Sequence, residues 1–353
     1  MMKTRNEASL KEFAPALIAW QKTHGRHDLP WQNTRDPYKI WLSEIMLQQT
    51  QVATVKDYFA RFLAAHPTVS SLAAASLDEV LGLWSGLGYY SRARNMHRCA
   101  QDVVALHGGE FPKHAVALQT LPGIGPSTAA AIASLCFGER VAILDGNVKR
   151  VLTRWLGFDA DLAKTAHERA LWRIATDLLP HDDLWTAMPH YTQGVMDLGA
   201  SLCSTRKPNC LLCPLQTQCV ASSQGQPERY PVKSRILKRS SESLWLLWAK
   251  RPDGAVYLEQ RPIPGVWAGL YCLPVFASYE ALAAAVPQAE ARHLQDGAAF
   301  KHVLTHKDLH LHPVNLVKTK SGQFEVQGQW FDKASWSKLG LPAPIRKLLE
   351  SAA

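Results

Sequence analysis

Long hydrophobic runs are missing from this sequence. No stretch of the 353 residues approaches the roughly 18 consecutive apolar residues that a membrane-spanning helix requires. Residues 1–9 lack the apolar core of a signal peptide, and the sequence contains no low-complexity segment and no repeat of fixed period. We therefore expect a cytoplasmic protein without a membrane partner.

Acidic residues are outnumbered by basic ones. The chain carries 30 Asp and Glu against 39 Lys and Arg, which gives a formal net charge of +9. This balance favours a polyanionic partner, although many basic proteins bind no nucleic acid. Hydrophobic residues make up 47% of the chain and charged residues 20%, which is typical of a globular protein, and the length suffices for two or three domains.

Cysteine is scarce outside one short stretch. Four of the seven cysteines fall within 17 residues and follow the spacing C-x6-C-x2-C-x5-C. The odd total and the clustering argue against a disulfide scaffold and favour a metal centre in a reducing compartment. The spacing favours a 4Fe–4S cluster, with a tetrahedral zinc site or four unrelated buried thiols as alternatives. The predicted metal ligands are Cys203, Cys210, Cys213 and Cys219.

Two segments have the features of phosphate-binding loops. Arg206 and Lys207 lie in a basic loop between the first two clustered cysteines. Residues 115–137 predict two helices joined by Leu-Pro-Gly-Ile-Gly, whose glycines allow a sharp turn and present backbone N–H groups at the start of the second helix. This pattern indicates a helix–hairpin–helix that binds a DNA phosphate, although an ordinary helical hairpin could use the same turn. The predicted contact residues are Leu121, Gly123 and Gly125.

Two carboxyl groups are predicted to differ in pKa. Glu44 follows the strong helix start Asp36-Pro37 and lies among apolar residues, where burial would raise its pKa and keep it protonated. Asp145 lies at the N-terminal edge of a predicted helix, whose N–H groups would keep it ionised. A proton donor and a charge stabiliser form the pair that breaks glycosidic bonds. The alternatives are a solvated Glu44 on the helix rim and an Asp145 that only caps its helix.

Seven motifs in collinear order resemble the adenine DNA glycosylases of the MutY type, within the endonuclease III superfamily. The resemblance covers nearly the whole chain. The motifs are Leu29-Pro-Trp31, residues 43–51, Gly86-Leu-Gly-Tyr-Tyr90, the Leu-Pro-Gly-Ile-Gly hairpin, residues 144–150, Asp197-Leu-Gly-Ala200 and the four clustered cysteines.

The resemblance implies the roles of the catalytic residues. Glu44 matches the acid that protonates adenine, and Asp145 matches the carboxylate that stabilises the sugar cation. Asn147 matches a residue that hydrogen-bonds near that carboxylate. Bifunctional relatives carry a lysine nucleophile where this chain has Ser127, so base removal without strand cleavage is expected.

The resemblance also implies the residues around a base flipped out of the duplex. Gln49 and Tyr89 match residues that fill or wedge the stack around the base opposite the target. Some relatives have arginine and glutamate in place of Gln32 and Gln193. The expected adenine pocket consists of Trp31, Gln32, Leu47, Gln193 and Ser127.

The C-terminal part of the chain has a different pattern. Residues 223–242 are polar, basic and proline-bearing, which indicates a linker, and short β-rich runs follow. Residues 261–271 resemble the Nudix-like domain of these glycosylases. The sequence lacks the R-E-x-x-E-E helix with which a Nudix hydrolase holds Mg²⁺, so binding without hydrolysis is expected. The family's Phe-Ser-His loop reads 8-oxoguanine; here Leu304 replaces the aromatic residue, and Thr305 and His306 keep the polar contacts.

The sequence thus predicts a multidomain enzyme: an all-α helix–hairpin–helix region (1–222) with an iron–sulfur loop (203–219), a linker (223–242) and an α+β Nudix-like lesion-recognition domain (243–353). The expected reaction is excision of adenine from double-stranded DNA, opposite 8-oxoguanine or guanine, by a nucleoid-associated monomer. A bifunctional pyrimidine-lesion glycosylase and lyase is one alternative, disfavoured by Ser127 and the C-terminal domain. A non-catalytic cluster-bearing DNA-binding protein is the other, and it requires Glu44 and Asp145 to be only rim and cap residues.

Overall fold

The computed structural model describes residues 7–234, 238–317 and 324–351, and the chain divides into two compact units. The helical unit combines residues 1–73 with residues 98–236, and the sheet unit combines residues 74–97 with residues 237–353. Residues 74–97, inside the predicted catalytic region, thus belong with the sheet. Residues 223–234, inside the predicted linker, belong with the helices.

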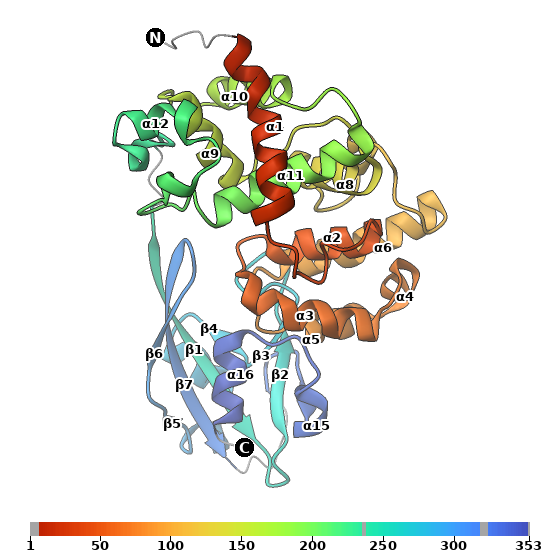
Figure 1. Cartoon of the computed structure of the whole chain (residues 1–353). Coiled ribbons are helices and arrows are strands. Elements are labelled where there is room, and N and C mark those ends of the chain that lie inside the picture. Colours follow the sequence, from red (N-terminus) through yellow and green to blue (C-terminus); the bar gives the residue numbers. More distant parts are fainter. Residues whose placement is uncertain (1–6, 235–237, 318–323, 352–353) are drawn as a thin grey trace. The chain divides into compact units, whose positions relative to one another are not determined.

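The helical unit is built almost entirely from helices (Figure 1). In the described ranges, no helix is both long and apolar enough to cross a membrane. Two helices, α4 (Val69–Ala74) and α6 (Ser91–His107), run across the boundary between the units. The others are α1 (Glu7–His24), α2 (Pro37–Leu47), α3 (Val52–Ala65), α7 (Ala115–Leu118), α8 (Pro126–Phe137), α9 (Gly146–Leu156), α10 (Thr165–Asp177), α11 (Leu184–Ala200) and α12 (Val220–Ser223), with the short 3-10 turns η1 (Cys210–Leu212), η2 (Gln216–Gln218) and η3 (Pro227–Arg229).

Aromatic packing fixes three of these helices against one another. Phe13 on α1 lies with its ring centroid 4.6 Å from that of Trp155 on α9 and 6.2 Å from that of Tyr191 on α11. All three side chains are buried, and burial of each apolar ring contributes about 1.5–3 kcal/mol. This core fixes the position of α9, which begins directly after Asp145, and of α11, which carries Gln193.

The predicted helix starts around the site are confirmed. Asp36 caps α2, its Oδ1 accepting a hydrogen bond from Tyr38 N at 2.9 Å, and Pro37 occupies the first helical position. In the hairpin, Gly123 adopts a φ of 78°, which favours glycine, and Gly125 is the N-cap of α8. The first hairpin helix, α7, is only four residues long.

The sheet unit contains one mixed sheet with strand order β3-β2-β1-β7-β5 (Figure 1). Strand β4 pairs with β1, β6 with β7 and β8 with β2. Among the strands of the described residues, only β1 and β7 pair in parallel. The strands are β1 (Ser240–Lys250), β2 (Val256–Gln260), β3 (Tyr271–Cys272), β4 (Val275–Phe276), β5 (Gln295–Asp296), β6 (Phe300–Val303), β7 (Lys307–Val317) and β8 (Gln329–Phe331). The helices are α5 (Leu77–Trp84), α13 (Tyr279–Ala284), α14 (Gln288–Ala291), α15 (Lys333–Trp336) and α16 (Ala343–Glu350).

Helices cover both faces of this sheet. Alternate residues of β1 point to opposite faces, so Leu246 packs in one core with Ile345 of α16 while Leu247 packs in the other with Leu282 of α13. Helix α5 joins the unit at Gly82, where a Cβ atom would lie 2.1 Å from Lys338 O. Only glycine permits this approach, which explains why α5 belongs with the sheet.

Candidate active site

Two adjoining cavities open in the helical unit. The first, of about 470 Å³, is lined by α2, α11 and the loop after α1, and the second, of about 890 Å³, extends from α2 to the start of α9. Both volumes fall within the range of small-molecule sites, roughly 300–1,000 Å³. The cavities share Arg26, Glu44, Leu47, Val52 and Met196, so they form one continuous site.

Glu44 lies on α2 where the two cavities meet. Burial, with a smaller contribution from the charge of Asp145, raises the pKa of the Glu44 carboxyl from 4.5 to about 7. A substantial fraction of the side chain is therefore protonated near neutral pH. This is the property that a general acid requires.

Asp145 lies in the second cavity and is also the N-cap of α9. Its Oδ1 accepts a hydrogen bond from Val148 N at 2.7 Å. Burial nevertheless raises the pKa of Asp145 above its ordinary value, while the backbone N–H groups of α9 and the charge of Arg150 act in the opposite direction. The predicted stabilisation by N–H groups is present, but burial outweighs it, which the sequence pattern did not indicate.

Three further side chains hold the loop and helix around Asp145. Ser127 Oγ accepts a hydrogen bond from the backbone N–H of the residue before Asp145 at 3.1 Å. Asn147 Oδ1 accepts one from Arg150 Nη2 at 2.8 Å, and Arg150 Nε donates to Cys203 O at 2.8 Å. Ser127, Asn147 and Arg150 all line the second cavity. The start of α9 is thereby tied to the first clustered cysteine.

A buried carboxylate organises the first cavity. Asp197, 1% exposed, accepts hydrogen bonds from Arg26 Nε at 2.7 Å and from Gln193 Nε2 at 3.0 Å, both to Oδ1. Arg26 N donates to the other oxygen at 3.0 Å. Arg26 and Asp197 are 171 positions apart. The sequence showed Asp197 only as part of a motif, and no local pattern indicated that Arg26 would be its partner.

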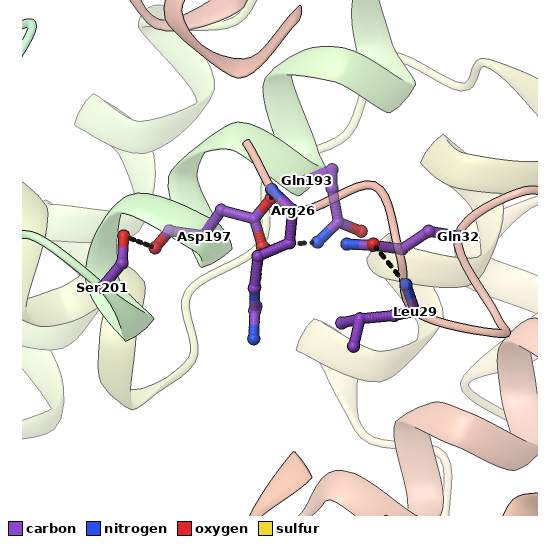
Figure 2. Close-up of polar contacts among 6 residues, drawn as sticks. All are labelled: Arg26, Leu29, Gln32, Gln193, Asp197 and Ser201. Carbon is purple, nitrogen blue, oxygen red and sulfur yellow. Dashed lines mark hydrogen bonds and ion pairs between the residues drawn. The ribbon is translucent and has the colours of Figure 1, made fainter. Parts of the chain in front are cut away.

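Two amides face the space beside this carboxylate. Figure 2 shows the side chains of Gln193, on α11, and Gln32, in the loop after α1, pointing toward each other. Because Gln193 donates its NH₂ group to Asp197, its Oε1 is left as an acceptor. Gln32 Oε1 accepts from Leu29 N at 3.4 Å, and its buried Nε2 has no hydrogen-bond partner among the described residues. Of the other predicted pocket residues, Trp31 and Leu47 line the same cavity, whereas Ser127 lines only the second one.

The four clustered cysteines line one small cavity of about 30 Å³. All four are partly buried and none forms a disulfide. Arg154, 2% exposed, donates to Cys203 Sγ at 3.4 Å and to Ser204 O at 2.6 Å, which holds the start of the loop on α9. Within the described ranges, no three His, Cys, Asp or Glu side chains are arranged to hold a single metal ion. The donor set of four unpaired thiols fits a metal centre chemically, and the centre stays a prediction.

The predicted DNA-contacting residues of the helical unit lie at its surface, except Leu121. Gln49, just after α2, is exposed and adopts a φ of 58°. The hairpin exposes Gly123 and Gly125, while Leu121 is buried beneath them.

The basic loop between the first two clustered cysteines is also exposed. The side chains of Arg206 and Lys207 both face solvent. The backbone N–H of Lys207 donates to Glu228 Oε1 at 2.7 Å. An anion at this loop would therefore be bound by side chains and not by that N–H group.

The sheet unit brings two predicted residues together that are 216 positions apart. The hydroxyl group of Tyr89, which is 43% exposed, forms a hydrogen bond with Thr305 Oγ1. Thr305 and His306 are exposed in the turn between β6 and β7. Leu304, which stands in place of the family's aromatic residue, packs against the core of the sheet unit.

Comparisons with known proteins agree with this arrangement. The chain matches the HhH-GPD superfamily base excision DNA repair proteins over residues 42–176 and the NUDIX domain over residues 245–351. An adenine DNA glycosylase of Buchnera aphidicola subsp. Acyrthosiphon pisum (strain APS) is 35% identical over 344 residues, covering 96% of this chain and 97% of that protein. The Homo sapiens adenine DNA glycosylase is 41% identical over 235 residues, covering 64% of this chain and 42% of the human protein.

A solved structure supports the fold of the helical part. A thermostable thymine-DNA glycosylase is 29% identical, with a TM-score of 0.54, and covers 62% of this chain and 98% of that structure. The predicted fold class, a helix–hairpin–helix region followed by a Nudix-like domain, is confirmed. With a full-length relative at this identity, the chain belongs to the adenine DNA glycosylase family.

Proposed function

We propose that this DNA N-glycosylase excises adenine that lies opposite 8-oxoguanine or guanine in double-stranded DNA, and leaves an abasic site. The main support is the pairing of Glu44 and Asp145 in one cavity, since burial and a neighbouring charge raise the pKa of Glu44 to about 7. Adenine as the base removed is supported by the names of the similar proteins. We expect the enzyme to act as a monomer at the nucleoid.

In the proposed reaction, Glu44 donates its proton to a ring nitrogen of the flipped adenine. The base then leaves as a neutral molecule with the electron pair of the glycosidic bond. Positive charge develops on the sugar, and the carboxylate of Asp145 stabilises it. Water adds to C1′ and loses a proton to the Glu44 carboxylate, which restores the acid and completes the abasic site.

The amides of the first cavity supply the proposed recognition of adenine. Gln193 Oε1 is free to accept a hydrogen bond from the exocyclic amino group, because its NH₂ group is bound to Asp197. Gln32 Nε2 is free to donate to a ring nitrogen. Trp31 and Leu47 supply apolar walls. Guanine has a carbonyl where adenine has the amino group. It would therefore place a hydrogen-bond acceptor opposite the acceptor Oε1 of Gln193.

We assign recognition of the opposite base to four residues. Gln49 and Tyr89 would occupy the stack around that base. Thr305 and His306 supply a hydroxyl and an imidazole for hydrogen bonds to 8-oxoguanine. The hydrogen bond of Tyr89 to Thr305 supports a common role, since it fixes both side chains on one surface of the sheet unit.

Ser127 predicts the reaction type. Its hydroxyl accepts a backbone hydrogen bond and offers no amine nucleophile. We expect an end-labelled duplex with one adenine opposite 8-oxoguanine to be cut at the adenine only after alkali treatment. Single-turnover incubation, with each time point divided into treated and untreated halves, measures this.

Each other outcome of that experiment contradicts part of the proposal. Cleavage without alkali would require a lyase nucleophile other than Ser127. Absence of product in both halves, with release of a damaged pyrimidine from a matched duplex, would favour the pyrimidine-lesion alternative. Duplex binding without any base release would favour the non-catalytic alternative.

We also propose that Cys203, Cys210, Cys213 and Cys219 hold a 4Fe–4S cluster. When bound, the cluster would cross-link the loop that carries Arg206 and Lys207 and so fix it for phosphate contact. Purified protein is expected to be brown, to absorb near roughly 400 nm and to contain about four irons per chain. Colourless protein that contains zinc would contradict this assignment.

A further inference from the structure

The segment from Pro227 to Ser234 lies within the predicted linker, yet it is fastened to the helical unit. Tyr230 is 4% exposed, and its carbonyl accepts a hydrogen bond from Arg154 Nε at 3.3 Å. Its hydroxyl donates to Gln224 at 3.1 Å. These contacts hold the middle of the segment against α9 and the end of α12.

The end of this segment has its own anchor. Val232 O accepts a hydrogen bond from Leu162 N at 3.1 Å. Ser234 donates to both carboxylate oxygens of Asp161, from N at 3.1 Å and from Oγ at 2.5 Å. The hydrogen bond from the Ser234 side chain is the largest of the causes that lower the pKa of Asp161 to about 2. The two neighbours of Lys233 in the chain, Val232 and Ser234, are thus both hydrogen-bonded to the helical unit.

This fastened segment forms one wall of the second cavity. Glu228, Tyr230, Pro231 and Lys233 line it together with Asp145. A linker in the ordinary sense would only connect domains, whereas here its side chains line the cavity that Glu44 and Asp145 also line. A nucleotide in this cavity would therefore have these side chains among its neighbours.

The charges of the cavity point to the role of Lys233. Arg26 is paired with buried Asp197, and Arg150 is bonded to carbonyl and amide oxygens. Glu228 on the same wall accepts the backbone N–H of Lys207. Lys233 is exposed and forms no ion pair within the described ranges. Among the lining residues that the structure describes, it is the cation left for a diffusible anion.

We propose that Lys233 binds a phosphate of the DNA strand whose nucleotide occupies the second cavity. The ligand is a phosphodiester, and its negative charge would pair with the ammonium group of Lys233. This inference rests on the proposed function, because the phosphate belongs to a DNA duplex from which one nucleotide is extruded into the cavity. Lys233 is a binding residue that holds the strand in place, and it takes no part in the bond cleavage assigned to Glu44 and Asp145.

The test measures binding to a duplex that carries a tetrahydrofuran abasic analogue opposite guanine, across a series of NaCl concentrations. Neutralising one phosphate contact changes the slope of log Kd against log salt by about 0.9. For Lys233→Gln we expect a slope lower by about this amount and an affinity several-fold weaker at low salt. Lys233→Arg keeps the charge and should restore both values.

The matched control is Lys238→Gln, an exposed lysine farther along the predicted linker that does not line the cavity. It should retain the wild-type slope. A Lys233→Gln slope equal to that of Lys238→Gln, or a Lys233→Arg variant as weak as Lys233→Gln, would overturn the proposal. Wild-type protein that binds the analogue duplex but releases no adenine from a duplex with adenine opposite 8-oxoguanine would contradict the proposed reaction instead. The salt slopes of the Lys233 variants would still decide the proposal on Lys233.

Discussion

Replacing Glu44 with Gln is expected to lower the rate of adenine release by about 100- to 10,000-fold, the range that a general acid contributes. The amide keeps the size of the side chain but has no acidic proton. Affinity for a duplex with the tetrahydrofuran analogue should stay within a few-fold of wild type, because that ligand offers no base to protonate. Single-turnover rates and binding curves for both proteins measure these effects. The matched control is Glu110→Gln, an exposed glutamate of the same unit that should keep the wild-type rate.

The pKa of Glu44 gives this variant a signature in stability as well. In wild type the folded-state pKa of about 7 lies above the usual 4.5, so ionisation of Glu44 destabilises the fold as pH rises between these values. Glutamine does not titrate. The free energy of unfolding of Glu44→Gln should therefore exceed that of wild type by up to about 3 kcal/mol above pH 7. Near pH 4 the two proteins should be almost equally stable.

The same pKa predicts a loss of wild-type activity as pH rises through about 7, because only protonated Glu44 donates. Thermal melting and single-turnover rates at matched pH values measure both effects. A solvated Glu44 on the helix rim would show neither. Full activity of Glu44→Gln would contradict the assignment of the acid directly.

The residues with local signals were predictable from the sequence. The Asp36-Pro37 helix start and the glycines of the hairpin depend on contacts within a few residues, and the structure confirms the elements they predict. The direction of the Glu44 pKa also followed from its apolar neighbours in the chain. The direction of the Asp145 pKa was harder to predict, because the burial of this side chain depends on elements distant in the sequence.

What escaped prediction depends on contacts between distant segments. Arg26 and Asp197 meet across 171 positions, and no periodicity reports such a pair. Residues 74–97 lie inside the predicted all-α region, yet they belong with the sheet, which Gly82 of α5 approaches closely. The composition of residues 223–242 is that of a flexible linker, and only the bonds made by Tyr230 and Ser234 show that part of it is fastened.

Helix α9 connects these features. Its first residues hold Asp145, and its later turns carry Arg150 and Arg154, which hold the cysteine loop and Tyr230. The carboxylate, the loop and the wall of the second cavity are thus positioned by one rigid element. Phe13, which also contacts Tyr191, packs against Trp155 of this helix and fixes it in the core.

Replacing Asp145 with Asn is expected to lower the rate of adenine release by at least about 100-fold, because the amide carries no charge to stabilise the sugar cation. The Asn side-chain oxygen can still accept the hydrogen bond of Val148 N, and asparagine is as good an N-cap as aspartate. Because burial raises the pKa of Asp145, its ionised form costs stability, and the uncharged amide should be at least as stable as wild type at neutral pH. Removing the charge of Asp145 also removes one cause of the raised pKa of Glu44, so the residual activity should decline at lower pH than in wild type.

The matched control is Asp36→Asn, which makes the same chemical change at the cap of α2, where Oδ1 accepts from Tyr38 N outside both cavities. Single-turnover rates, thermal melting and the pH profile of both variants separate the two roles. If Asp145 were only a cap, both variants would keep the wild-type rate of adenine release and would lose no stability. A loss of rate confined to Asp145→Asn, without a fall in melting temperature, assigns the charge of Asp145 to the reaction itself.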